Sequence, residues 1–361
     1  MNADRQFLVR LAVIALALST LFVAADAIKK GSNIPPTKPG EEPYVGLYAQ
    51  PTTGLEVMLN EGDGQSFAAL AQDPTLSRPE VFHPSKEEAA YRAQRPLLGW
   101  LAWITSAGQA SWVPPALAVW AVLGFVLLLV VAAAIAIELE RDPLWSLAVM
   151  LCPGALINLD WAGPEALGTS LAALGTIWWF GRRPHRLAAV GCFIAAGLCR
   201  ETLMLVPVVV GLVTVLRRGR DSWQALLLAS VPAVYAAWTV VVHERFGAWP
   251  TDGGYGRLGR PFEGLLDMAS HWQAGDVLVV ALGVVLVVAA MVRRPRDVFS
   301  LVALAYAAFA TLMGSSVWAR YQDFSRVLLP LFVFAILGLL PDRRGSMRPV
   351  GAARTPAVSS P

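Results

Sequence analysis

The chain has 361 residues, of which 56% are hydrophobic and only 15% are charged, and its formal net charge is +3. A soluble globular protein carries about 25% charged residues, so this composition excludes an ordinary soluble fold and favours a membrane protein. The basic residues form short loop clusters without interleaved aromatic residues, which argues against nucleic-acid binding. Arginine outnumbers lysine, as is typical of bacteria with GC-rich genomes.

The N-terminal part predicts one membrane helix followed by a long loop. The first apolar run, residues 11–27, is long enough to span a bilayer. Residues 24–27 also resemble a signal-peptidase site. We favour an uncleaved helix, and either interpretation places the next segment of the chain outside the cytoplasm. Residues 29–95 then form a long polar outer loop, which opens with an irregular Pro/Gly-rich stretch at residues 31–43.

The rest of the chain is dominated by apolar runs. Residues 96–106 do not fit as a crossing and predict a juxtamembrane or re-entrant helix on the outer face. Nine further runs cover residues 113–137, 143–158, 165–180, 187–199, 202–216, 223–242, 276–292, 298–316 and 327–341. Together with the first run, they predict an all-α polytopic integral membrane protein with about ten transmembrane helices.

Arginine clusters determine the predicted topology. They lie around residues 182–186, 217–220, 293–296 and 343–344. The positive-inside rule places all four in the cytoplasm, so both termini are expected on the cytoplasmic side of a bacterial inner membrane. Residues 1–341 then form a single membrane domain with a second outer loop at 243–273. Residues 342–361 are predicted to be a disordered cytoplasmic tail.

This topology collects acids and arginines on the outer face. The runs at 187–199 and 202–216 must form a hairpin, with Arg200 and Glu201 at its outer tip. The candidate site residues are Asp63, Gln65, Arg92, Arg95, Asp160, Glu165, Arg200, Glu201 and Arg326. Ionisable groups near the hydrocarbon cost free energy, and they persist where they pair or serve a function.

The outer set suits one kind of chemistry. A carboxylate at the membrane boundary can act as a general base toward a hydroxyl group. Arginines beside it can bind a phosphate and stabilise it as a leaving group. The combination favours transfer of a sugar from a lipid-linked phosphosugar to a glycan or lipid acceptor outside the cytoplasm.

The order of the outer motifs resembles that of a known family. One membrane helix precedes a first loop that contains Gly62-Asp63-Gly64-Gln65, Ala71-Gln72-Asp73-Pro74 and Tyr91-Arg92-Ala93-Gln94-Arg95-Pro96. Outer Gly-Pro-Glu and Arg-Glu-Thr segments come later in the chain. Over roughly residues 7–340, the chain looks like the bacterial GT-C-type polytopic membrane glycosyltransferases.

The resemblance implies an inverting enzyme of cell-surface glycopolymer formation that uses a polyprenyl-phosphate-linked sugar. It implies that Asp63, in the first outer loop, is the catalytic base, and that a late outer arginine, here Arg326, binds the carrier phosphate. The chain departs from the family where Gly62 replaces an aromatic residue and Ser66-Phe67 replaces an aromatic pair. These departures weaken the inference of donor-sugar contacts at those positions.

Structural interpretations compete with these roles in the first loop. Asp63 between two glycines could be a turn residue, and Asp73 is interpreted as a turn or a helix stop. Arg92 and Arg95 share one helix face. There they either anchor the following helix by snorkelling or bind phosphate.

The later candidates have structural interpretations as well. Glu165 begins a helix, where a carboxylate is favourable regardless of function. Arg200 and Glu201 could pair with each other or with Asp160. Arg326 could belong to a local ion-pair set around Asp323.

No cofactor is predicted. The three cysteines lie in apolar runs, and His243 has no second histidine at ligand spacing, so the sequence does not indicate a divalent cation. Two rival functions remain open. One is a transporter or flippase for a lipid-linked glycan, a class that usually shows inverted repeats and polar groups at the bilayer midplane. The other is a non-catalytic subunit of a cell-envelope glycan assembly.

Overall fold

The computed structural model describes residues 3–34, 51–60, 63–78, 82, 85–217, 222–253 and 257–342. The predictions for the tail beyond residue 342, for most of the Pro/Gly-rich stretch and for Gly62 lie outside the described residues. So do residues 218–220 of the second arginine cluster and the whole cluster at 343–344.

The described part of the chain is all-helical, as predicted, and forms no strand. Four segments are long and apolar enough to cross a membrane. They are α1 (Ala3–Ser32), α6 (Val113–Glu138) with the preceding 3-10 turn Ala110–Trp112, the 3-10 helix Ser222–Ala229 with α11 (Ser230–Phe246), and α13 (Ala274–Arg293). Large apolar side chains on the outer surfaces of α1 and α13 are exposed, as expected for faces that contact lipid.

Two further apolar segments are bent. The 3-10 helix Pro143–Leu151 meets α7 (Pro153–Asp160) at 61°, and α16 (Tyr321–Val327) meets α17 (Leu329–Leu339) at 58°. With each pair taken as one span, the number rises to six. The sequence predicted an uninterrupted run over residues 143–158 and the start of another run at residue 327, and a proline stands at the start of α7 and of α17. Proline lacks an N–H group and disfavours a helical residue before it, so each helix restarts at that point.

The remaining apolar helices are shorter than a typical span. They are α8 (Glu165–Phe180), α9 (Arg186–Cys199), the 3-10 turn Glu201–Met204 with α10 (Leu205–Leu216), and α14 (Val298–Ala310). The chain breaks at Arg200, as the sequence predicted, because the backbone there is extended. α8 packs closely on α9, since an added Cβ at Gly175 would lie 2.8 Å from the Phe193 ring.

The first loop differs from its prediction. It contains α2 (Gly54–Asn60), α3 (Gly64–Gln72) and α4 (Lys86–Ala93), followed by α5 (Pro96–Ser106), which has the predicted bounds. Eight of the nine residues of α3 are buried. The apolar ones among them, with α4, α5, the end of α11 and the start of α6, form a second apolar core. The expected polar loop is therefore a packed helical cap, whose apolar segments are too short to be recognised as spans.

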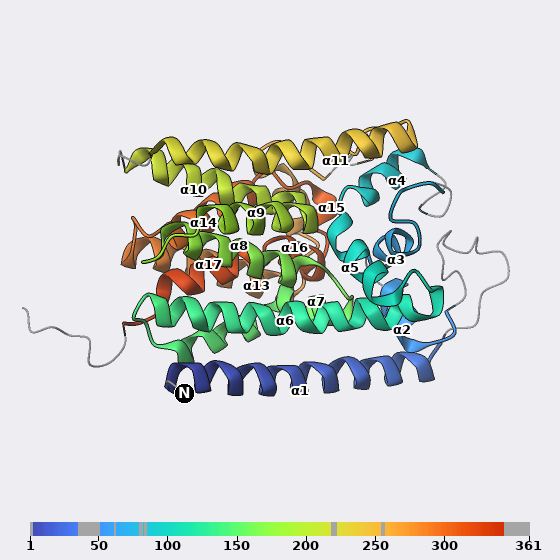
Figure 1. Cartoon of the computed structure of the whole chain (residues 1–361), viewed down its shortest axis with the longest axis horizontal. Coiled ribbons are helices and arrows are strands. Elements are labelled where there is room, and N and C mark those ends of the chain that lie inside the picture. The colour runs from blue at the N-terminus through green and yellow to red at the C-terminus, as the bar shows by residue number, and fades with distance from the viewer. Residues whose placement is uncertain are drawn as a thin grey trace, which may run out of the picture.

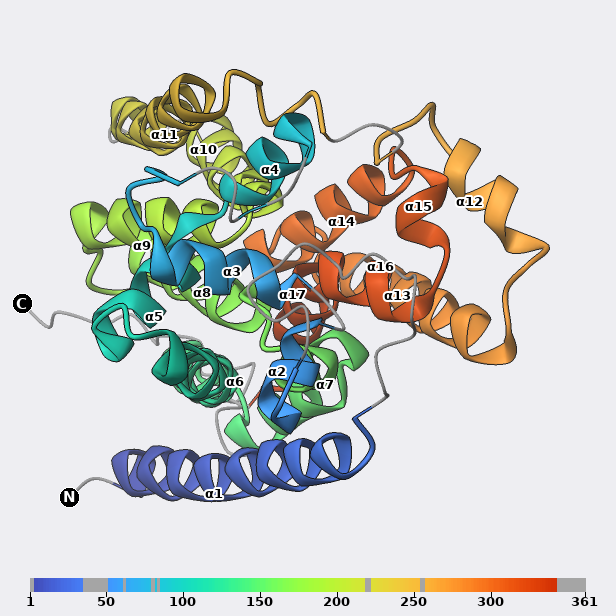
Figure 2. The same ribbon diagram turned by 90° about the vertical axis from the view of Figure 1, so that its right-hand side faces the viewer.

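The charged residues separate to two ends of the bundle. At one end, which we call the basic end, the backbone N–H of Arg182 donates to Glu138, Arg141 pairs with Asp297, and Arg294 pairs with Asp342. In Figure 1, α2 to α5 gather at the opposite end, which we call the site end, together with α15 (Ser315–Trp318). Figure 2 looks onto the site end, with α3 near its centre and α1, α11 and α12 (Glu263–Ala269) at its periphery.

Candidate functional site

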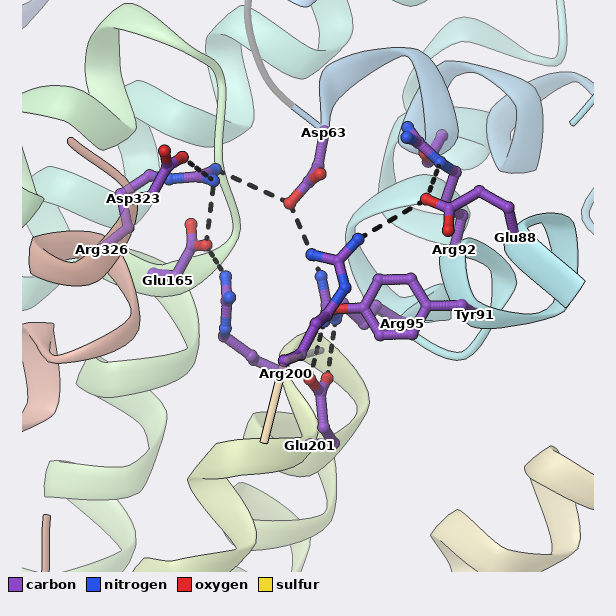
Figure 3. A network of polar contacts seen from close by, with 12 residues as sticks. Asp63, Glu88, Tyr91, Arg92, Arg95, Glu165, Arg200, Glu201, Asp323 and Arg326 are labelled. Carbon is purple, nitrogen blue, oxygen red and sulfur yellow. Dashed lines mark hydrogen bonds and ion pairs between the residues drawn. The ribbon is translucent and has the colours of Figure 1, made fainter. Parts of the chain in front are cut away.

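The site end holds a cluster in which buried arginines surround one aspartate. Asp63 Oδ2 lies 3.5 Å from Arg95 Nη1 and 3.7 Å from Arg326 Nη1. Arg200 lies nearby, and all three arginines are buried. Figure 3 shows the Asp63 carboxylate pointing between the guanidinium groups of Arg95 and Arg326. Each arginine comes from a different element, since Arg95 precedes α5, Arg200 precedes a 3-10 turn and Arg326 lies in α16.

Local structure leaves the Asp63 carboxylate available. Asp63 stands at the N-cap position of α3, yet among the described residues its side chain makes no capping hydrogen bond. The turn is closed by the backbone, because Ser66 N–H donates to the Asp63 carbonyl over 3.0 Å. An added Cβ at Gly64 would lie 2.7 Å from Leu59 Cα, so α3 can start this close to α2 only with glycine there. The turn interpretation of Asp63 thus accounts for its backbone but not for its carboxylate.

Arg95 is fixed from two sides. Its Nε and Nη2 donate to the two carboxylate oxygens of Glu201 over 2.7 and 2.6 Å. Nη2 also donates to the Tyr91 hydroxyl over 2.7 Å. Arg95 is therefore a preorganised cation and does not snorkel toward solvent.

Glu165 connects the other two arginines. Its side chain, 1% exposed, accepts a hydrogen bond from Arg200 and lies 3.7 Å from Arg326 Nη1. The Arg326 guanidinium also stacks 4.5 Å above the Trp161 ring. An added Cβ at Gly163 would lie 2.5 Å from Glu165 Oε2, so the turn before α8 leaves just enough room for this carboxylate. Glu165 begins α8, as the capping interpretation expects, but it is also the main partner of Arg200.

Ion pairs extend the cluster beyond this centre. They link four arginines with four carboxylates, a set whose formal charge is zero. The members are Arg95, Arg200, Arg320, Arg326, Asp63, Glu165, Glu201 and Asp323. A second set of Arg92, Arg257 and Glu88 lies at the edge and shares no ion pair with the first among the described residues. Burial raises the pKa of Asp63, but Arg326, Arg95, Arg200 and Arg92 together hold it well below its usual range. Asp63 is consequently ionised at physiological pH.

Several buried polar atoms in the cluster lack a hydrogen-bond partner among the described residues. They are Glu165 Oε2, Arg200 Nε, Arg326 Nε and, next to Arg326, Ser325 Oγ. Buried polar groups are almost always hydrogen-bonded, to protein, to water or to a ligand. Their concentration at one place indicates that the cluster accommodates a polar occupant.

The structure brings some predicted site residues together and leaves others apart. Arg92 lies at the edge, where it pairs with Glu88 over 2.9 Å. Glu88 also pairs with Arg257. Gln65 donates to Asn60 over 2.7 Å and makes no hydrogen bond to the cluster in the described part of the chain.

Asp160 also lies apart, since it pairs with Lys30 and ties α7 to α1. Arg200 and Glu201 pair neither with each other nor with Asp160, because each finds a partner on another element. Arg326 does belong to an ion-pair set with Asp323, at 3.8 Å, as the cautious interpretation expected, and it reaches Asp63 and Glu165 as well.

Sequence reasoning missed two residues of the site. Tyr91 lies four positions before Arg95, so helical spacing alone could have identified it as a partner. Trp161 is not among the predicted site residues, but it is buried under Arg326. No local signal connects Trp161 with a residue so distant in the chain. Asp73 is structural as predicted, since it ends α3 and accepts from the backbone of Arg78.

An apolar cavity of about 240 Å³ adjoins the cluster. It lies between α13, α14 and α17, and Trp318 and Phe324 contribute to its wall. α16 therefore carries Phe324 on the cavity side and Arg326 on the cluster side. No group of three or more His, Cys, Asp or Glu side chains that could hold a metal ion occurs among the described residues.

Comparisons of the chain with protein-family models, with characterised proteins and with solved structures find no match. Function must then be inferred from the site itself, because a fold alone does not specify an activity. The site offers cationic groups that can hold an anion, one partly exposed carboxylate and an adjoining apolar cavity. Such a combination suits an amphipathic anionic substrate.

Proposed function

We propose that this protein is a GT-C-type membrane glycosyltransferase. It transfers a sugar from a polyprenyl-phosphate carrier to an acceptor on the outer face of the bacterial cytoplasmic membrane, in cell-surface glycan synthesis. The observation that carries the proposal is the Asp63 carboxylate, 29% exposed, held among buried arginines at one end of an apolar helical bundle. The described loop arginines that favour the cytoplasm, among them Arg182 and Arg294, lie at the other end.

In this proposal, all ten apolar helical segments cross the membrane and both termini are cytoplasmic. α8 runs from the cluster to the basic end in 16 residues, which corresponds to about 24 Å at 1.5 Å per residue. The hydrocarbon core is about 30 Å thick. With the basic end at the cytoplasmic boundary, the cluster lies close to the outer boundary, where a lipid-linked phosphate is presented.

The proposed reaction is a single displacement at the anomeric carbon. The acceptor hydroxyl attacks this carbon from the face opposite the phosphate, and its proton passes to Asp63. A bond from the acceptor oxygen to the anomeric carbon forms, and the bond from that carbon to the phosphate oxygen breaks. The electron pair leaves with the phosphate, whose growing charge Arg95, Arg200 and Arg326 stabilise. One displacement inverts the configuration.

The remaining parts of the site support this assignment. Glu201 and Glu165 hold the arginines in place, so the charge-stabilising groups need little reorganisation during the reaction. The apolar cavity between α13, α14 and α17 offers room for part of the carrier lipid. Because α16 borders both regions, phosphate and lipid can be bound side by side.

A flippase for a lipid-linked glycan is the second candidate, because broken helices are common in transporters and two apolar segments here are bent by about 60°. Transporter sites lie near the bilayer midplane, about 15 Å from either boundary of a 30 Å core. The length of α8 instead separates the cluster from the basic end by about 24 Å. This separation favours the transferase.

The decisive experiment measures cell-surface glycan composition in a deletion strain. The strain is complemented at matched protein levels with wild type, Asp63→Asn or Asp267→Asn, which removes the same charge from an exposed site in α12. We expect wild type and Asp267→Asn to restore a missing sugar and Asp63→Asn to fail, because it lacks the base. Restoration by Asp63→Asn would reject catalysis through Asp63 and favour a flippase or a non-catalytic subunit.

A further inference from the structure

Asp63 is bound differently from the other acids at the centre of the cluster. Glu201 makes two short hydrogen bonds to Arg95, and Glu165 accepts one from Arg200. Asp63 approaches its arginines only to 3.5 and 3.7 Å. These separations exceed those of good N–H···O hydrogen bonds, which are about 2.7–3.2 Å. The carboxylate is thus attracted by charge and is not locked by geometry.

The space that Asp63 enters is suited to another anion. Arg95 and Arg326 approach it from two sides, and Arg326 Nε and Arg200 Nε are buried donors without a partner in the described structure. A planar guanidinium group can donate two parallel hydrogen bonds to two oxygens of a phosphate. The single, more distant carboxylate oxygen of Asp63 does not accept such a pair of bonds. A phosphodiester also carries one negative charge, as Asp63 does. It can replace the carboxylate without changing the charge between the arginines.

We propose that Asp63 is an internal substitute ligand, which occupies the phosphate site between Arg95 and Arg326 until a phosphate group displaces it. The displaced carboxylate, no longer paired with the arginines, is then the general base. The identity of the phosphate as that of a lipid carrier rests on the proposed function, whereas the competition between carboxylate and phosphate does not. The donor therefore binds before the base becomes active.

Competition between Asp63 and phosphate predicts the opposite change in affinity from the one expected for a residue that binds the ligand. Removing a ligand-contacting group normally weakens binding, but removing a competing carboxylate strengthens it. We therefore expect Asp63→Asn to bind phosphate more tightly than wild type, by about tenfold or more, which corresponds to about 1.4 kcal/mol. The asparagine has nearly the same shape, so the gain comes from the lost charge.

The experiment measures binding of inorganic phosphate and of farnesyl phosphate by calorimetry, in one detergent, to the full-length protein at about pH 5, where each ligand carries about one negative charge. Asp267→Asn is the control for net charge, and Asp323→Asn removes a carboxylate 3.8 Å from Arg326 that does not bridge to Arg95. We expect no gain for Asp267→Asn and a smaller gain for Asp323→Asn than for Asp63→Asn. An equal gain in all three variants, or none in Asp63→Asn, would overturn the proposal.

Two further measurements separate the possible outcomes. Melting of each ligand-free variant establishes that Asp63→Asn is folded, and Asp63→Asn with Arg326→Gln should lose the gain if Arg326 forms the site. A gain for farnesyl phosphate supports a lipid source, whereas a gain for inorganic phosphate alone supports displacement by a free phosphate.

The proposed function and the displacement can fail independently. If Asp63→Asn loses glycan transfer but gains no affinity, the transferase stands and the displacement is rejected. If it gains affinity but restores the glycan, the displacement of Asp63 stands and the transferase is rejected.

Discussion

The substitution Glu165→Gln tests whether the buried ion pairs of the cluster, and not helix capping, explain this acid. Glutamine keeps the shape of the side chain and removes its charge. Arg200 then loses its only ion-pair partner in the described structure, and Arg326 keeps only Asp63 at 3.7 Å and Asp323 at 3.8 Å. Both guanidinium groups are buried, so water cannot readily replace the lost carboxylate.

The two interpretations of Glu165 predict different magnitudes. Breaking a buried ion pair by removing one partner costs about 3–5 kcal/mol, because an uncompensated charge stays buried. Loss of a favourable charge at a helix N-terminus costs only about 0.3–1 kcal/mol. We expect Glu165→Gln to fall in the first range and the exposed control Asp267→Asn to stay within about 0.5 kcal/mol of wild type.

The assay is reversible unfolding in mixed micelles of mild detergent and sodium dodecyl sulfate, followed by tryptophan fluorescence. A double-mutant cycle adds Arg200→Met, which replaces the orphaned cation with an apolar side chain. The double variant should be more stable than Glu165→Gln alone, because the uncompensated charge is gone. A loss below about 1 kcal/mol for Glu165→Gln, with no coupling to Arg200, would refute the ion-pair explanation and leave capping as the role of Glu165.

The geometry of the site makes three further predictions. Gly163→Ala places a Cβ 2.5 Å from Glu165 Oε2 and should abolish transfer, whereas Gly191→Ala, with no described atom within 4 Å of the added Cβ, should leave transfer unchanged. Tyr91→Phe removes the hydroxyl that accepts from Arg95 and should lower stability by about 0.5–1.5 kcal/mol and raise KM for the donor; an unchanged KM would separate Tyr91 from donor binding. The arginines hold the pKa of Asp63 far below its usual range in the free protein. The pH profile of kcat/KM should therefore show no decrease due to protonation of Asp63 above about pH 4. Bound phosphate offsets the arginine charges and raises this pKa. On acidification, kcat should therefore begin to fall at a higher pH than kcat/KM does. A fall of both at the same pH would argue against displacement of Asp63. The stabilisation due to ionised Asp63 should likewise be present above the unfolded pKa of about 3.9 and be lost only as the pH falls below it toward the folded pKa.

The helical architecture and the residues offered to the site were predictable because both depend on local properties of the chain. Apolar runs longer than about 12 residues predict helices whatever their neighbours, and an arginine followed by a glutamate interrupts such a run, as Arg200 and Glu201 do. Proline likewise predicts where a helix can restart, although the break before Pro153 was not anticipated. The order of residues along the chain likewise separates the loop arginines from the other charged residues.

Partners within the cluster were decided only by tertiary structure. The sequence offered Glu165, Arg200 and Glu201 as one charged group, yet Glu165 pairs with Arg200 while Glu201 pairs with Arg95. These choices depend on which helix ends meet. That depends in turn on close contacts such as the one at Gly154, where an added Cβ would lie 2.2 Å from the Ser325 carbonyl oxygen beside Arg326. Ion pairs act over a few ångströms in space, whereas sequence patterns report only separation along the chain, so the sequence determined which charges reach the site end and packing determined which of them meet Asp63.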